Sequence, residues 1–310
     1  MKRIAILLLF SSLALTIGAI NDPPRPRILG ISHMALFVGD LAKSRAFYED
    51  FLGYAEPYNL KRDDGSVHIA FIKINEDQYI ELFTDPPKQD GQMSHIAFYT
   101  DSAEGMREYL ASQGVKVPAA VNTGKIGNSE FDVTDPDGHT IEIVQYEPDG
   151  WTRREHGDFL PDTRISTDMR HVGVTIAALD PAMKFYGGSL GFTEFWRGSG
   201  DGKILSWVNL RVPDGQDYIE FMLGSGPLDA KQQGVKNHIC LVVPDMDQAV
   251  ATLQSRAAAA NYTLPIVIKV GVNGKRQANL FDPDGTRIEL MEPDTFDHKP
   301  VPSSTAPPPM

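Results

Sequence analysis

The stretch SHMALFVGDLAKSRAFYEDFLGY, residues 32–54, combines two different periodicities. An alternating apolar run leads to a turn that contains Asp40, and an amphipathic segment then ends at Gly53. Alternation is typical of a β-strand, and a helical period that stops at a glycine is typical of an α-helix. The stretch therefore predicts a short strand followed by a helix.

A second copy of this pattern, RHVGVTIAALDPAMKFYGGSLGF, occupies residues 170–192. The two copies align His33 with His171, and their Phe-Tyr and Leu-Gly pairs also coincide. Weaker copies begin with SHIAFYT and NHICLVV, and each helical segment is followed by strand-like runs such as QYIELF, HTIEIVQ, DYIEFML and RIELME. Such self-similarity indicates a repeat architecture. Each of the four modules should consist of a strand, a helix and two or three antiparallel strands.

The sequence Asp-Pro-Asp-Gly occurs twice, at residues 135–138 and 282–285, between the last two strands of the second and fourth modules. Proline is pre-set for one central turn position, and glycine tolerates a positive φ. These turns predict hairpins. The boundaries that follow are a first domain at 31–146, a linker at 147–168, a second domain at 169–293 and a Pro/Ser-rich tail at 294–310 that we expect to be disordered.

The chain has 310 residues and a formal net charge of −12, with no run rich in lysine or arginine. This balance argues against nucleic acid and anionic membrane surfaces as partners. The single cysteine, Cys240, lies in an apolar strand-like run and is interpreted as a buried structural thiol. With one cysteine the chain cannot form an internal disulfide.

Residues 1–19 have the features of a secretory signal peptide. Lys2 and Arg3 precede an apolar core, and small residues around Gly18 and Ala19 would allow cleavage. A retained membrane anchor is the alternative, because the apolar run is close to the shortest length that spans a bilayer. The first interpretation predicts an exported protein, periplasmic or extracellular, with no membrane association after cleavage.

Histidine and glutamate recur at one place in every module. The first strands carry histidine near their start, and the last strands carry glutamate between aliphatic residues: His33, His95, His171 and His238, with Glu81, Glu142, Glu220 and Glu289. Each alone could be a satisfied polar side chain or an outward residue of an edge strand. Together they favour metal ligands, because strand alternation selects one face and a buried carboxylate is costly unless it is paired or metal-bound. Mixed nitrogen and oxygen donors suit Fe, Mn, Ni, Co or Zn.

The motifs SHMALFV, AFYEDFLGY, QYIELF, DPDGHTIEI, RHVGVTI, KFYGGSLGF and DPDGTRIEL resemble the vicinal oxygen chelate superfamily, which includes glyoxalase I, bleomycin-resistance proteins and extradiol dioxygenases. The resemblance implies an α+β fold in which four βαβββ modules pair into two cupped mixed sheets, each holding one metal. The full His-Glu-His-Glu sets of both halves are similar to that of glyoxalase I.

Two family features differ here. The arginine that glyoxalase I carries shortly after its first histidine is absent, and Asn279 stands where extradiol enzymes carry tyrosine. The resemblance implies a small-molecule substrate that chelates the metal, an enolate-like intermediate, and proton transfer by Glu142 or Glu289. Lyase or isomerase chemistry is therefore expected. Ring cleavage at His171, His238 and Glu289 is one alternative, and a binding protein that sequesters its ligand is another. The oligomeric state is left open.

Overall fold

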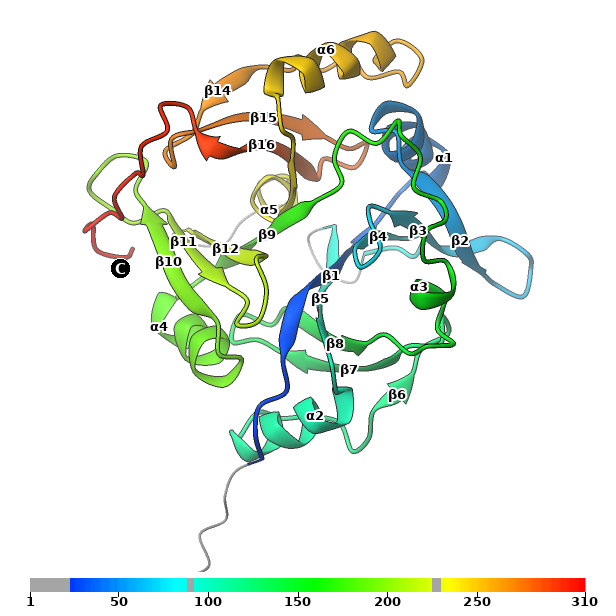
Figure 1. Cartoon of the computed structure of the whole chain (residues 1–310), viewed down its shortest axis with the longest axis vertical. Coiled ribbons are helices and arrows are strands. Elements are labelled where there is room, and N and C mark those ends of the chain that lie inside the picture. Colours follow the sequence, from blue (N-terminus) through cyan, green and yellow to red (C-terminus); the bar gives the residue numbers. More distant parts are fainter. Residues whose placement is uncertain (1–22, 88–91, 225–229, 310) are drawn as a thin grey trace, which may run out of the picture.

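The computed structural model describes residues 23–87, 92–224 and 230–309. The segment predicted to be a signal peptide lies outside the described residues. Two eight-stranded sheets, each strongly curled, make up the body of the molecule (Figure 1). Among the described helices, none combines the length and the apolar character needed to cross a membrane.

The first half contains two modules, each a strand, a helical segment and three further strands. The first consists of β1 (Ile28–Phe37), α1 (Leu41–Arg45), the π-helical segment η1 (Ala46–Phe51), β2 (Ala55–Lys61), β3 (Val67–Lys73) and β4 (Tyr79–Phe83). The second consists of β5 (Met93–Thr100), α2 (Ala103–Ser112), β6 (Asn122–Thr123), β7 (Ser129–Thr134) and β8 (Thr140–Gln145). A short helix, α3 (Trp151–Arg154), follows in the linker.

The second half repeats this order. Its first module consists of β9 (Met169–Ile176), α4 (Leu179–Ala182), the π-helical segment η2 (Met183–Ser189), β10 (Thr193–Gly198), β11 (Trp207–Arg211) and β12 (Tyr218–Leu223). After α5 (Ala230–Lys236), its second module consists of β13 (His238–Val242), α6 (Met246–Arg256), β14 (Ile268–Val270), β15 (Lys275–Phe281) and β16 (Arg287–Thr295).

The two sheets have the same topology. Their strand orders are β2-β3-β4-β1-β5-β8-β7-β6 and β10-β11-β12-β9-β13-β16-β15-β14. In each sheet the two central strands are antiparallel, and each pairs in parallel with the last strand of its own module. The expected α+β fold, with four βαβββ modules in two curled mixed sheets, is confirmed.

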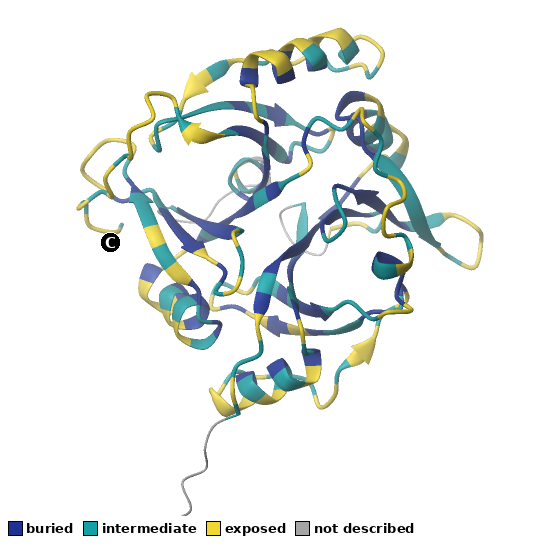
Figure 2. Cartoon of the chain, in the orientation of Figure 1, coloured by how far each residue is buried: buried dark blue, intermediate teal, exposed yellow. Residues whose placement is uncertain are grey.

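Helices α1, α2, α4 and α6 lie on the outer faces of the sheets, whereas α3 lies inside the curl of the first sheet (Figure 1). The strands curve around two separate centres. Buried residues run along the central strands, while exposed residues gather at the periphery (Figure 2). Helices α2 and α6 begin with side-chain caps, because Ser102 and Asp245 accept hydrogen bonds from the first-turn backbone. Apolar residues on the inner helical faces, such as Met106 and Leu253, join the core.

The Asp-Pro-Asp-Gly turns also connect the two halves. Tyr48 of the first half donates its hydroxyl to Asp282 Oδ2 at 3.1 Å. Tyr186 of the second half donates to Asp135 Oδ2 at 2.9 Å. The sequence predicted only hairpins here, so this reciprocal pair of contacts across the seam, the boundary between the two halves, was not anticipated.

The Pro/Ser-rich tail, which the sequence analysis expected to be disordered, follows the second half as an extended segment (Figure 1). The backbone N–H of Ser304 donates to the carbonyl of Arg197 at 2.9 Å, and Leu205 donates to the carbonyl of Pro307 at 2.8 Å. Proline lacks a backbone donor but keeps its carbonyl acceptor, so a proline-rich segment can still be held against a strand edge.

Candidate metal centres

The first quartet, defined as His33, Glu81, His95 and Glu142, lies on one face of the first sheet. Its members come from β1, β4, β5 and β8. Ala35 is in register with both Glu81 and His95, and because side chains alternate along a strand, the quartet residues share its face. The small alanine leaves room between the four side chains.

The donor atoms of the first quartet point toward one another. His33 Nε2 lies 2.9 Å from His95 Nε2. The same His33 atom is 3.6 Å from Glu81 Oε1 and 3.7 Å from Glu142 Oε1. His33, Glu81 and His95 offer donor atoms that lie within 4.8 Å of one another.

The second quartet, defined as His171, Glu220, His238 and Glu289, repeats this arrangement on β9, β12, β13 and β16. His171 Nε2 and His238 Nε2 are 3.1 Å apart. His238 Nε2 lies 3.6 Å from Glu220 and 3.4 Å from Glu289. In this half all four residues offer donor atoms within 4.8 Å of one another.

Small residues again lie at the base of the second quartet. Gly173 is in register with both Glu220 and His238. A Cβ at Gly173 would approach the His238 ring to 2.0 Å, so this close packing requires glycine. Cys240, in register with His171, is fully buried beside it, and burial raises the pKa of its thiol well above the usual value.

Burial controls the charge of the imidazoles. It lowers the pKa of His95 to about 4, and together with the neighbouring imidazole it lowers the pKa of His33 well below its usual value. Burial is also the largest cause that lowers the pKa values of His171 and His238. A neutral imidazole presents a free lone pair, which is the form that binds metal ions.

The carboxyl groups respond to burial in two ways. Burial raises the pKa of Glu81, Glu142 and Glu220. Glu289 is equally buried, but the hydrogen bond with His238 and then the charge of Arg287 outweigh burial and lower its pKa. Two imidazole nitrogens and two carboxylates facing one point would relieve this desolvation by binding a divalent cation, so the residues present fit a metal.

The far side of each imidazole is held differently in the two halves. In the first, His33 Nδ1 lies 2.9 Å from Ser32 Oγ, and His95 Nδ1 lies 3.3 Å from Ser94 Oγ. In the second, His171 Nδ1 has no hydrogen-bond partner within the described chain. Hydrogen bonds to the outer nitrogen orient a ligand histidine, so the first quartet is the better organised of the two.

His238 Nδ1 has two neighbours that favour opposite tautomers. The Lys236 carbonyl is 2.7 Å away and accepts a hydrogen bond from Nδ1–H, which leaves the Nε2 lone pair free to bind a metal. Arg287 Nη2 is also 2.7 Å away and can only donate. The same Arg287 Nη2 lies 3.6 Å from Glu289 Oε2, so this guanidinium contacts two members of the quartet.

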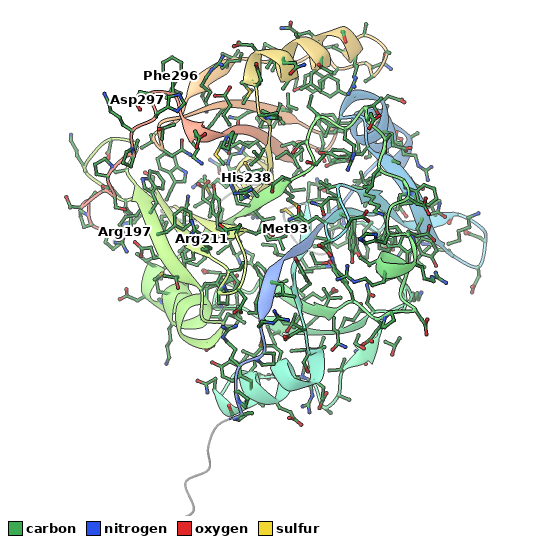
Figure 3. The ribbon with its side chains drawn as sticks, in the orientation of Figure 1. Met93, Arg197, Arg211, His238, Phe296 and Asp297 are labelled. Atoms are coloured by element: carbon green, nitrogen blue, oxygen red, sulfur yellow. The ribbon has the colours of Figure 1, made fainter. Side chains whose placement is uncertain are left out.

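The second quartet opens into a cavity of about 200 Å³. Glu220, Glu289 and Arg287 form its floor, and Trp196 and Trp207 form part of its wall. Figure 3 labels His238 in this half, near the middle of the curled sheet. Two carboxyl groups of the quartet are thus accessible to a small molecule.

The concave face of the first sheet is covered by the linker. Trp151 is only 2% exposed and stacks on Tyr58, with ring centroids 5.7 Å apart. Its ring also contacts Phe71 and Tyr79. A separate cavity of about 290 Å³ is lined by His95 together with Asp132, His139 and Met93.

The structure brings together all eight residues that the sequence selected. Sequence reasoning missed Arg287, which stands two residues before Glu289 where the first half has Thr140, and comparing the two last strands would have revealed it. It also missed Trp151, because the linker was interpreted from its turn formers and charges. No simple sequence signal places a linker side chain inside a curled sheet.

Known proteins of similar sequence or structure include lyases and dioxygenases. Lactoylglutathione lyase of Schizosaccharomyces pombe is 25% identical over 234 residues, 69% of this chain and 70% of the lyase. A probable lactoylglutathione lyase of Synechocystis is 31% identical over 121 residues, 36% of this chain and 92% of that protein. The crystal structure of homoprotocatechuate 2,3-dioxygenase from Arthrobacter globiformis has a TM-score of 0.65 at 20% identity, covering 93% of this chain and 87% of that one.

At that level of identity the dioxygenase shares the fold, and the likeness goes no further. The family model described as Glyoxalase/Bleomycin resistance protein/Dioxygenase superfamily matches residues 30–143 and again residues 169–290. Both matches include a complete histidine and glutamate quartet. Since they cover most of both halves, the chain belongs to the glyoxalase, bleomycin resistance protein and dioxygenase superfamily.

Proposed function

We propose that the protein is a metal-dependent enzyme of the lyase or isomerase type, acting on a small molecule that chelates through neighbouring oxygen atoms. The convergence of two neutral imidazoles and two buried carboxyl groups in each half carries this proposal. Such a donor set suits Fe, Mn, Ni, Co or Zn. A divalent metal bound there would supply Lewis-acid stabilisation of negative charge on substrate oxygens.

The second half is the proposed site of the chemistry. Its cavity is lined by two carboxyl groups of the quartet, Glu220 and Glu289, whereas the cavity of the first half reaches only His95 of its quartet. In this proposal Glu289, which lines the cavity, removes a proton from the carbon next to the chelating oxygens and returns it to the neighbouring carbon. The first quartet, with Glu142 in the matching place, would hold a metal mainly for stability.

Ring cleavage by a dioxygenase is the second candidate, supported by the structural likeness to homoprotocatechuate 2,3-dioxygenase. It would use His171, His238 and Glu289 and leave Glu220 without a ligand role. The presence of a fourth buried donor favours the lyase or isomerase reaction. A sequestering protein without chemistry would not need two complete quartets.

One experiment separates these candidates. The purified protein, loaded in turn with each candidate metal, is incubated in D₂O with a panel of α-hydroxyketones and hemithioacetals, and in parallel with catechols under air. We expect deuterium incorporation next to the carbonyl, lost in Glu289→Gln but retained in the first-half variant Glu142→Gln. Oxygen consumption with catechols and no proton exchange would favour the dioxygenase. Neither activity with any metal would contradict both enzymatic proposals.

Export is part of the same proposal and rests on residues 1–19. N-terminal sequencing of the protein recovered from a host's extracytoplasmic fraction should begin at Ile20 or close to it. Recovery of the uncleaved chain in the membrane fraction would instead support a retained anchor.

A further inference from the structure

Lys73 and Arg211 occupy equivalent places in the two halves, at the ends of β3 and β11. The buried Lys73 ammonium donates to the main-chain carbonyls of the linker residues Glu155 and Asp158, the second at 2.9 Å. Arg211 is exposed, stacks on Phe195 at 4.8 Å, and forms no ion pair within the described part of the chain. The cation at this position binds linker carbonyl oxygens in the first half, whereas in the second half the equivalent cation has no ion-pair partner in the described chain.

The same exchange occurs at two further positions. Arg170 stands immediately before the first histidine of its half, where the first half has Ser32, whose hydroxyl accepts from Tyr146 at 2.7 Å. Lys275 follows Gly274, and Asn128 follows Gly127 at the equivalent place in the first half; both glycines have a positive φ. The Asn128 side chain donates a hydrogen bond to Thr152 of the linker. Three positions that the first half uses to bind its own chain are thus cationic in the second.

These three cations line one cavity of about 240 Å³. Arg170 is paired with Asp168, so its charge is balanced. Lys275 Nζ donates one hydrogen bond to the carbonyl of Pro293 at 2.6 Å and keeps two further donors. Neither Arg211 nor Lys275 has a carboxylate within 4 Å among the described residues, and Asp294 acts on Lys275 only from a longer distance. The cavity therefore carries net positive charge.

The cationic cavity adjoins the second quartet. Tyr218 forms part of its wall and packs on the His171 ring, with centroids 4.5 Å apart. Trp196 and Asn273 line both this cavity and the one that reaches Glu289. A single small molecule can therefore contact the quartet at one end and the cations at the other.

We infer that the second half carries a subsite for an anionic group, a carboxylate or a phosphate, formed by Arg211, Lys275 and Arg170. This inference rests on the proposed function in one respect, namely that the anionic group belongs to the same substrate whose oxygen atoms face the quartet. A planar guanidinium binds such oxyanions through two parallel hydrogen bonds, and the ammonium adds a point charge. The tail residues Thr295 and Val301 close one side of the subsite.

The test uses three probes of similar shape: benzoate, phenyl phosphate and the neutral benzamide. Binding is measured by isothermal titration calorimetry on the full chain. We expect both anions to bind and benzamide to bind at least about tenfold more weakly, since a hydrogen bond to a charged group has this effect. The ratio of benzoate to phenyl phosphate affinity identifies which oxyanion the subsite prefers.

Arg211→Gln and, independently, Lys275→Gln should each weaken the binding of the anions about tenfold or more and leave benzamide unchanged. Arg197→Gln is the matched control, because Arg197 lies on the adjacent strand β10 and is already paired with Glu194 (Figure 3). Benzamide binding as tightly as the anions would overturn the inference, and so would unchanged affinity in both folded variants. An equal loss in Arg197→Gln would also overturn it, since it would indicate non-specific attraction.

The same titration on His171→Ala with His238→Ala separates this inference from the proposed function. If that variant loses its metal and still binds benzoate or phenyl phosphate, the subsite exists independently of the quartet. If the wild-type protein takes up metal but binds neither anion, the subsite is wrong and the metal proposal stands. Anion binding by a protein that never takes up metal in this half would support the subsite and contradict the proposed function.

Discussion

The two halves share one topology and one set of candidate ligands, yet their concave faces are used in opposite ways. In the first half the linker covers the sheet with Trp151, and the polar positions around it bind the chain itself. In the second half the same positions are Arg170, Arg211 and Lys275, and they line an open cavity. The two halves therefore share one scaffold, and the segments that follow them differ in how far they cover its concave face.

The surroundings of the quartets differ in charge as well. Asp132, opposite Glu142, lies beside the first quartet, and burial raises the pKa of its carboxyl. Asn279 takes that place opposite Glu289 in the second half, and Arg287 is added. Negative charge near a quartet strengthens the binding of a cation, and positive charge weakens it while favouring an anionic ligand. The first half is suited to retaining a metal and the second to binding a charged molecule.

The largest expected effect concerns metal content. We predict up to two metals per chain, with His33→Ala plus His95→Ala removing one equivalent and His171→Ala plus His238→Ala removing the other. Because serine hydroxyls orient the first pair and a cation adjoins the second, the first site should bind at least about tenfold more tightly. Elemental analysis after dialysis against graded chelator measures both quantities. Loss of both metals in either folded variant would mean that the halves share ligands.

The next prediction tests whether Trp151 is structural. Trp151→Ala should lower the free energy of unfolding by about 3–5 kcal/mol, the usual cost of removing a buried large aromatic side chain. Trp196→Ala is the matched variant in the second half, where the ring borders a cavity, and it should cost only about 1 kcal/mol. Urea denaturation followed by circular dichroism gives both values. Equal costs would show that the two concave faces are filled to the same degree.

The fold and the quartets were predictable because they repeat. Four strands with histidine and four with glutamate carry a signal that no single strand carries, and strand alternation then places the side chains on one face. That reasoning put His33 and Glu289 on the faces of their sheets where the other quartet members also lie, although each has an ordinary explanation when taken alone. Local pattern and repetition were sufficient for the scaffold.

The features that distinguish the halves were not predictable, because they depend on contacts between segments without internal periodicity. Trp151 lies in a linker whose composition indicates only turns. Arg211 is one exposed arginine among many until β11 is compared with β3, the equivalent strand of the first half, which ends at Lys73. The tail was expected to be disordered from its composition, yet hydrogen bonds to Arg197 hold it against β10.

A smaller effect is expected at the seam, where the pKa values of the two turn aspartates are shifted in opposite directions. Burial raises the pKa of Asp282 to about 6 from a reference of 3.8. The folded protein therefore binds this proton more tightly than the unfolded chain, and stability falls as the pH rises from about 4 to 6. In Asp282→Asn the amide oxygen can still accept from the backbone N–H groups of Asp284 and Thr286, and the amide nitrogen can donate to the Tyr48 oxygen. The substitution should therefore stabilise the protein by up to about 3 kcal/mol at pH 8 and have little effect at pH 4.

Asp135→Asn is the matched variant and should have the opposite sign. Burial acts to raise the pKa of Asp135, but the hydrogen bond and charge of His139 outweigh it, so the pKa is lowered. Stability from this group is present at neutral pH and is lost as the pH falls. Thermal denaturation of both variants from pH 4 to pH 8 checks the pair. Stabilisation by Asp135→Asn at pH 8 would contradict the assigned charge difference.

The smallest expected difference separates the two tyrosines that join the halves. Asp282 Oδ2 has no described partner except the Tyr48 hydroxyl, whereas Asp135 Oδ2 also accepts from His139 Nδ1 at 2.9 Å. Tyr48→Phe should therefore cost about 1.5–3 kcal/mol, since it leaves a buried acceptor unpaired, and Tyr186→Phe about 1 kcal/mol. The comparison is valid because both rings are fully buried and the substitution removes one hydroxyl in each case. Equal costs from urea denaturation at pH 8 would mean that His139 does not compensate at Asp135, and the seam would then be symmetric where the concave faces are not.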